Sequence, residues 1–281
     1  LRPCQSRDQI EQQVVPGRCA TRRDDSVFRP ASNQKKGANI HAVTSQQNTT
    51  LHSAAIGGNI GIAKLLLTKN SDILRKNSKK QSPFHVALKY TNLDIAELFL
   101  SKEAGIYIRG KSGNGLLEKM AFEHNVNSLQ FLLQKGLRIG KENEQGAILL
   151  QKAAHPLGIG DGIVATFQFL ISQKADIHAK REDGSTLLHN SHILIEPELT
   201  KLLLAKGLQA NAKNQDGRTP LHEAALSGYS EEPFEQSLKL LIRKGAKIHT
   251  KDKEGNTPLA LAKENDNEKT IELLQRLGAK R

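Results

Sequence analysis

The chain carries one short phrase that recurs at a nearly fixed interval. Its clearest copy runs from Thr219 to Ala225, and the place of His222 in that copy serves as a ruler for the others. The matching positions elsewhere are His52, His85, Glu118, Gln151, His189 and Ala260. The successive intervals are 33, 33, 33, 38, 33 and 38 residues. Such a period predicts a row of small stacked units rather than one globular core around a cleft.

Each unit reads as a turn followed by two helices. A pair such as Asp216-Gly217 precedes the phrase and favours a tight hairpin, because Gly accepts positive φ. Thr then lies where a helix N-cap belongs and Pro at the first helical position, as in Thr219-Pro220 and Thr257-Pro258. A second apolar run follows, such as Leu238–Ile242. Several of these runs stop at a glycine expected to be a left-handed cap: Gly136, Gly207, Gly245 and Gly278.

The phrase, its period and the order of turn and helices together resemble the ankyrin repeat. The resemblance covers residues 35–281 and implies an all-α fold, an ankyrin-type α-solenoid of about seven helix-loop-helix repeats linked by β-hairpin turns. We expect this domain to begin with a half repeat. Residues 1–34 carry six Arg and no Lys, which predicts a non-repeat leader that is disordered or foreign to the array. The resemblance also implies that the recurring His is structural and hydrogen-bonds between neighbouring repeats: His52, His85, His189 and His222.

Both 38-residue intervals place their extra residues between the two helices of a unit. One insertion lies at 156–162 and the other at 228–234. Insertions in repeat arrays gather on one face and often take part in binding, and Tyr229 and Phe234 favour that interpretation because aromatic side chains serve as anchors. The alternative is a surface loop that grew because loop length costs little entropy.

The net charge of +12 is unevenly spread. The leader, with six Arg against four acidic residues, supplies two of these charges, and the array the other ten. Early turns are basic, whereas later turns mix signs. The turn tips of neighbouring repeats should lie side by side, so the basic ones predict a positive patch for an acidic protein, phosphate groups or nucleic acid. No aromatic residues interleave with these charges, which disfavours nucleic acid, and a solvated Lys-rich edge is the alternative.

The catalytic and metal-binding motifs that can be found lack the neighbouring elements or ligands that they need. Residues 105–112 match the P-loop pattern, but the repeat register predicts a helix before them, a turn across them and the next helix only from about Leu116. The recurring His are separated by stacking, and no Cys or acidic cluster completes a zinc site around His189 and His192. There is no G-x-S-x-G, H-E-x-x-H or G-x-G-x-x-G motif. We therefore expect no catalytic residue, metal or cofactor, and no enzyme activity.

Cysteine usage and hydropathy bear on location. Cys4 and Cys19 both lie in the leader, so no disulfide holds the array, and no apolar stretch approaches membrane-spanning length. Both observations favour a cytoplasmic, intracellular location, with a secreted effector or a nuclear protein as alternatives.

The sequence thus predicts a scaffold that binds another protein, acidic in character, through turn tips and the concave surface of the first helices. The residues expected to contact this partner are Arg75, Lys76, Lys79, Lys80, Arg109 and Lys111, followed by Glu223, Ser227 and Tyr229. The alternatives are a targeting module of a larger enzyme, a host-directed bacterial effector and a nucleic-acid-associated factor. The identity of the partner and the oligomeric state do not follow from the sequence.

Overall fold

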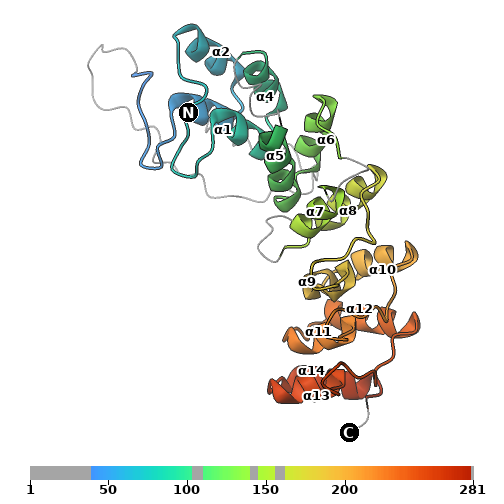
Figure 1. Ribbon diagram of the computed structural model, residues 1–281. Coiled ribbons are helices and arrows are strands. Elements are labelled where there is room, and N and C mark those ends of the chain that lie inside the picture. The colour runs from blue at the N-terminus through green and yellow to red at the C-terminus, as the bar shows by residue number, and fades with distance from the viewer. Residues whose placement is uncertain (1–38, 103–109, 140–144, 156–161, 280–281) are drawn as a thin grey trace, which may run out of the picture. The chain divides into compact units, whose positions relative to one another are not determined.

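The computed structural model describes residues 39–279 except 103–109, 140–144 and 156–161 (Figure 1). The chain divides into two units, residues 1–39 and 40–281, and every helix described below belongs to the second. The boundary expected between residues 34 and 35 lies outside the described residues and stays a prediction.

Within the described residues, the second unit consists of helices in consecutive pairs (Figure 1). The first members are α1 (Thr50–Gly57), α3 (Pro83–Lys89), α5 (Gly110–Phe122), α7 (Gln145–Ala153), η3 (Leu187–His189) with α9 (Ser191–Leu194), α11 (Pro220–Leu226) and α13 (Pro258–Glu264). The second members are α2 (Ile60–Thr68), α4 (Leu93–Leu100), α6 (Val126–Gln134), α8 (Ile163–Ser172), α10 (Pro197–Ala205), α12 (Glu232–Arg243) and α14 (Glu268–Arg276). First helices pack on first helices and second on second, as in α1 on α3 and α10 on α12. The predicted all-α solenoid is confirmed.

Helix ends follow the sequence signals. Thr219 is the extended N-cap of α11 and Pro220 its first residue, and the Thr257 hydroxyl accepts the Ala260 N–H at 3.2 Å at the start of α13. At the far end of α12, Gly245 takes φ +88° and lets the Ala246 N–H reach the Leu241 carbonyl at 2.9 Å. Each unit therefore begins and ends on local chemistry before packing contributes.

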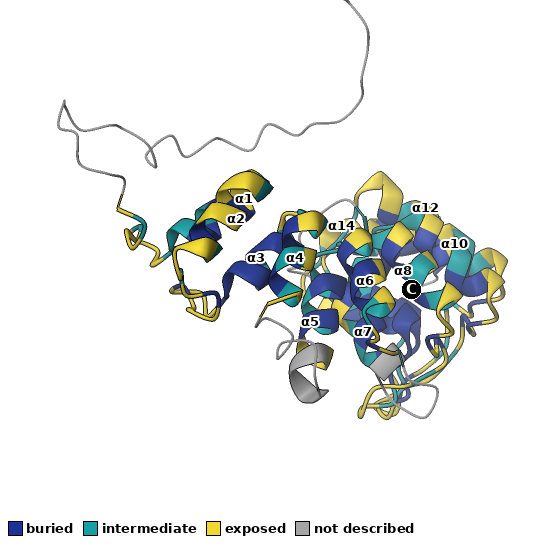
Figure 2. Ribbon diagram, turned by 90° about the horizontal axis from the view of Figure 1, so that it is seen from above, coloured by how far each residue is buried: buried dark blue, intermediate teal, exposed yellow. Residues whose placement is uncertain are grey.

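The core runs along the whole stack between the two rows of helices, as the dark-blue residues of Figure 2 show. Leu and Ala fill most of it. The bulkiest members that are fully buried are Phe84, Phe99, Phe167 and Phe234. The larger apolar cluster reaches from α1 to α14, and a smaller one joins α11, α13 and α14 at the C-terminal end, so the units share their cores with their neighbours.

A turn segment precedes most of the first helices and is called a finger below: residues 43–49, 74–82, 180–186, 212–219 and 250–257. Neighbouring fingers are hydrogen-bonded through their backbones. The Gln215 N–H donates to the Asp183 carbonyl at 2.8 Å, and the Lys253 N–H donates to the Asp216 carbonyl at 2.9 Å. Within the described residues the fingers contain no strand, and Val43 and Thr49 form an isolated antiparallel bridge. Finger tips therefore lie side by side, as the repeat register predicts.

One glycine tests this stacking. Gly217 has φ +75°, and a Cβ there would lie 3.1 Å from the Lys253 backbone nitrogen, whereas the equivalent Gly255 has φ +90° and nothing within 4 Å. Both Gly217→Ala and Gly255→Ala should lose about 1–2 kcal/mol of unfolding free energy to the left-handed backbone. Gly217→Ala should lose about 1 kcal/mol more because the next finger must shift. Urea unfolding of both variants measures the difference, and equal losses would show that the fingers are not tightly packed.

The first unit leaves part of α2 uncovered. Ile62 is 48% exposed and Leu65 is 59% exposed. The residues in the place of Ile62 in the later units are all fully buried: Ile95, Ser128, Thr166, Leu199, Ser237 and Thr270. Those residues are covered by the preceding layer, and α2 belongs to the first layer among the described residues.

The expected start of the third unit was wrong. Helix α5 begins at Gly110 instead of near Leu116, so residues 110–112 are helical rather than part of a turn. The cause is visible in the phrase, because Gly115 stands where copies such as Thr49, Ser82 and Thr219 have a capping hydroxyl. Without a residue that caps a helix at this place, the residues before it are free to continue the helix toward the N-terminus.

Candidate functional site

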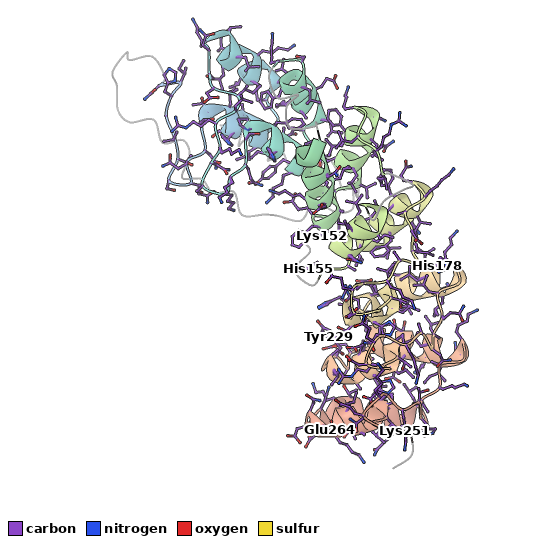
Figure 3. The ribbon with its side chains drawn as sticks, in the orientation of Figure 1. Lys152, His155, His178, Tyr229, Lys251 and Glu264 are labelled. Atoms are coloured by element: carbon purple, nitrogen blue, oxygen red, sulfur yellow. The ribbon has the colours of Figure 1, made fainter. Side chains whose placement is uncertain are left out.

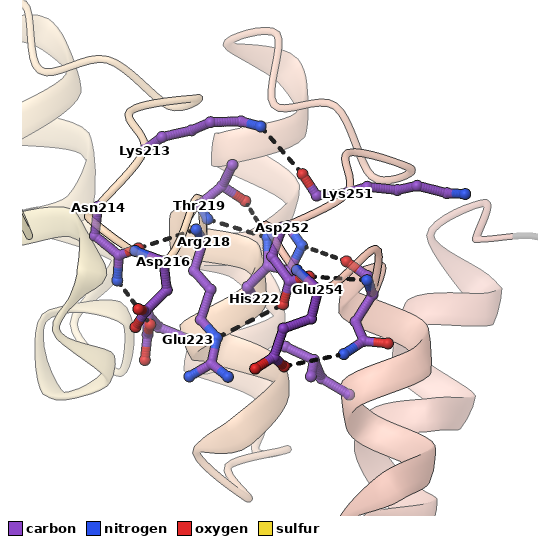
Figure 4. Close-up of polar contacts among 12 residues, drawn as sticks. Lys213, Asn214, Asp216, Arg218, Thr219, His222, Glu223, Lys251, Asp252 and Glu254 are labelled. Carbon is purple, nitrogen blue, oxygen red and sulfur yellow. Dashed lines mark hydrogen bonds and ion pairs between the residues drawn. The ribbon is translucent and has the colours of Figure 1, made fainter.

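The recurring histidines join one repeat to the next. His222 Nδ1 accepts the Thr219 backbone N–H at 3.0 Å, and its Nε2 lies 3.1 Å from the Asn256 carbonyl in the following finger (Figure 4). His52 and His189 repeat this arrangement, with Nε2 at 2.9 Å from the Gln81 carbonyl and 3.1 Å from the Arg218 carbonyl. Since Nδ1 accepts a hydrogen bond, Nε2 carries the proton and donates it. The expected bond between repeats is present at these three positions.

This arrangement requires neutral rings. Burial is the main cause that lowers the pKa of His52, His189 and His222, and the hydrogen bonds to the next repeat oppose it only in part. Burial, with the nearby charges of Lys119 and Lys76, lowers the pKa of His85 to about 4. These imidazoles are structural and are poorly suited to proton transfer near neutral pH.

The finger between α2 and α3 holds the predicted basic residues. Its backbone is fixed by side chains, since Asp72 Oδ1 accepts the Leu74 and Arg75 N–H groups at 2.8 and 3.1 Å. Asn77 Oδ1 accepts the N–H groups of Lys79 and Gln81, each at 3.0 Å. The four cationic side chains of this finger are all exposed, and none forms an ion pair with a described residue: Arg75, Lys76, Lys79 and Lys80. The name "basic finger" is kept for these four residues.

The first helices continue the positive charge. Lys119 on α5 is half-buried, and its pKa is lowered first by burial and then by the charges of Lys89 and Lys79, with Glu123 opposing. Lys89 Nζ lies 4.0 Å from a Glu123 carboxylate oxygen, and burial raises the pKa of Glu123. Lys119 and Lys89 were not predicted from the sequence. Lys119 follows Glu118 by one residue and Lys89 follows His85 by four, where Glu118 and His85 are the equivalents of His222.

Two of the predicted contact residues are not found beside the basic finger. Arg109 is outside the described residues. Lys111 belongs to helix α5 rather than to a finger, for the reason given above. The basic surface of the described residues is therefore the basic finger with Lys89 and Lys119, rather than two adjacent turns.

The second-tier residues are less exposed than a contact surface would suggest. Glu223 is half-buried, its carboxylate accepts the Asn214 amide at 3.3 Å (Figure 4), and burial raises its pKa. The Ser227 hydroxyl donates to the Ala224 carbonyl at 2.8 Å. Tyr229 is half-buried, with its ring centroid 5.4 Å from that of His192. Phe234, expected as an exposed anchor, is fully buried because it lies on the inner side of α12.

The second insertion is accordingly part loop and part helix. Residues 228–231 join α11 to α12, and Glu232 to Phe234 form the first turn of α12. The first insertion lies at residues 156–161, outside the described residues, apart from Gly162. Elsewhere in the described ranges, no helix has the length and apolar character needed to cross a membrane. No group of three His, Cys, Asp or Glu in those ranges gathers as a metal site would require.

The comparisons agree with the architecture. A family model described as "Ankyrin repeats (3 copies)" matches residues 19–112 and 157–232, and one described as "Ankyrin repeat" matches residues 216–253. The human ASB11 ankyrin repeat domain is 20% identical, with a TM-score of 0.61 over 83% of this chain and 100% of that one. The ankyrin repeat domain of Bcl-3, a member of the IkappaB family, is 24% identical, with a TM-score of 0.52 over 81% of this chain and 98% of that one. These two likenesses show the fold alone, and no curated protein matches the chain. Because the family matches span more than half of its residues, the chain belongs to the ankyrin repeat family.

Proposed function

We propose that this protein is a binding scaffold that holds an acidic segment of a partner protein against the basic finger and the neighbouring first helices. Ankyrin repeats are generally protein–protein interaction modules. The observation that carries the proposal is the group of four exposed cations on one backbone-fixed finger, without an ion pair among the described residues. Surface cations that are not paired retain their full field for an incoming partner.

The first helices extend this surface inward. Lys119 and Lys89 add positive charge on α5 and α3, and the lowered pKa of Lys119 reflects burial together with the field of neighbouring lysines. An approaching carboxylate would relieve this repulsion. The fixed finger supports binding because little conformational freedom is lost when the partner arrives.

Charge reversal tests the proposal. Lys79→Glu combined with Lys80→Glu in the chain of residues 1–281 should weaken binding of an acidic partner by about tenfold or more, since each reversal replaces attraction by repulsion. Both residues are exposed, so the melting temperature should stay within about 2 °C. Capture from cell lysate identifies the partner, and a titration with that partner then measures the affinity of each variant.

The matched control is Lys251→Glu with Lys253→Glu, which reverses two exposed lysines on the last finger. This control should keep the affinity of the unmodified protein. Equal affinity for all three proteins would remove the basic finger from the binding surface. Capture of nucleic acid alone, with steep loss of affinity in salt, would replace the protein partner by a nucleic-acid one.

A further inference from the structure

A row of rings crosses four consecutive repeats near the ends of their first helices. The Phe122 and His155 ring centroids are 5.4 Å apart, and those of His192 and Tyr229 are also 5.4 Å apart. His155 and His192 belong to neighbouring repeats, and His155 acts electrostatically on His192. His155 and Tyr229 lie on the same side of the stack (Figure 3). The row is called the ring row below.

A hollow of about 280 Å³ lies at the Tyr229 end of this row. Ile195, Pro233, Phe234 and the Tyr229 ring give it apolar walls, and Glu231 stands beside them. The buried Phe234 holds the Tyr229 ring from behind, with 5.8 Å between centroids, and the Tyr229 carbonyl accepts the Thr270 hydroxyl at 3.3 Å. The hollow is thus a packed feature of the fold. It is smaller than typical small-molecule sites and suits a single apolar side chain.

The side chains beside the ring row carry both signs of charge, with the lysines before the hollow. Lys152 lies on the same side of the stack as His155 and Tyr229 (Figure 3), its side chain is 49% exposed, and its Glu118 partner is 4.0 Å away. Lys119 and Lys89 lie in the preceding repeats, Lys89 in a 4.0 Å ion pair with Glu123. Glu231 stands at the hollow, in the field of Lys269, and Glu264 lies farther along the same side (Figure 3). An acidic segment would therefore find its cations on the Lys152 side of the hollow.

We propose that the ring row and the hollow bind an extended acidic peptide segment that places one apolar side chain in the hollow. The acidic residues of that segment lie along Lys152 and Lys119. An extended segment turns alternate side chains to one face, which suits a narrow row that offers one ring in each repeat. The inference rests on the proposed protein-binding function and adds the class of segment, its direction along the array and its anchor.

Synthetic peptides with two independent features test the inference on the chain of residues 1–281. One feature is a run of alternating Asp and Glu, and the other is a Leu anchor placed a few residues beyond the run. Four fluorescent peptides carry both features, the acidic run alone, the anchor alone or neither. In an anisotropy titration, the peptide with both should bind about tenfold more tightly than the peptide with the acidic run alone. Reversing the order of run and anchor should remove this gain.

Variants separate the anchor from the charge. Ile195→Gln, which makes one wall of the hollow polar, should abolish the gain from the Leu anchor. Pro233→Gln alters an exposed wall residue and repeats the test if the first variant folds poorly. Lys152→Glu should weaken the peptides with an acidic run by about tenfold and leave the anchor-only peptide unchanged. Lys251→Glu, an exposed lysine outside the ring row, is the control that should change nothing (Figure 3).

The outcomes distinguish this inference from the function on which it rests. In one outcome, the peptides with an acidic run bind, Lys79→Glu with Lys80→Glu removes this binding, and the anchor adds nothing. That result would overturn binding at the ring row and the hollow and would retain the basic finger. An anchor gain that survives both Ile195→Gln and Pro233→Gln would place the anchor outside the hollow and also overturn it. No binding by any peptide would overturn it as well, and the captured partner would still test the basic finger.

Discussion

Lowering the pH from about 7 to about 5 should remove about 2 kcal/mol of unfolding free energy through His85. The reference pKa of histidine in an unfolded chain is about 6.5, whereas the folded protein holds His85 at about 4 and also lowers the pKa of His52, His189 and His222. Below pH 6.5 the unfolded chain therefore binds protons that the folded chain refuses. This stability is complete above about pH 6.5 and is lost as the pH falls toward the folded pKa, and the figure counts His85 alone.

The measurement is urea unfolding of the chain of residues 1–281 at both pH values, alone and as His85→Gln. The variant should lose about 2 kcal/mol less on acidification, because the unfolded chain then has one fewer group to protonate. Exposed His178→Gln is the matched control and should keep the full pH dependence. Burial raises the pKa of Glu123 and Glu223, which opposes the loss, but these carboxyls are common to all three proteins. An identical pH dependence in His85→Gln would contradict the assignment of a neutral buried ring.

Phe234→Ala should cost about 3–5 kcal/mol of unfolding free energy. Phe234 is fully buried, and the Tyr229 ring packs against it with 5.8 Å between centroids. Removal of the ring leaves a cavity beneath the second insertion that the packed α12 cannot readily fill. Denaturant unfolding at neutral pH measures the loss.

Tyr90→Ala is the matched control, because Tyr90 is a half-exposed aromatic residue at the C-cap of α3, and it should cost less than about 1 kcal/mol. A large loss for Phe234→Ala with a small one for Tyr90→Ala would identify the insertion as part of the core. Losses of the same small size in both variants would return Phe234 to the role of a surface residue, which the sequence had suggested.

The parts of the structure that the sequence predicted are those set by local chemistry. Thr219 and Pro220 start α11, and Gly245 ends α12, through hydrogen bonds and backbone angles of their own segments. The units and their order therefore follow from the repeated phrase. The start of α5 was predicted wrongly because the register was copied onto a unit that had lost its Thr or Ser N-cap. The sequence shows this loss as Gly115-Leu116, and it argued against a helix start at Leu116 more strongly than the 33-residue spacing argued for one.

The candidate site was less accessible to sequence reasoning. The basic finger could be found because its cations are consecutive in the chain. The burial of Phe234 depends on which side of α12 faces the stack, and a five-residue insertion removes the register that would have settled it. The ring row joins Phe122 and His155, which occupy the same place in their repeats, to His192 and Tyr229, which occupy other places. Only the packed structure brings such residues together.

The uncovered side of α2 has a consequence for how the basic finger behaves. In a stacked array, each layer owes much of its stability to its neighbours, and the layer of α1 and α2, with Ile62 and Leu65 exposed, has a described neighbour on one side only. Such a layer opens at a smaller free energy than unfolding of the whole chain. The basic finger follows α2 directly, so a ligand seated there also clamps this layer. Ligand binding at the basic finger and local opening of this layer are then coupled, because a ligand that binds only the closed layer raises the free energy needed to open it.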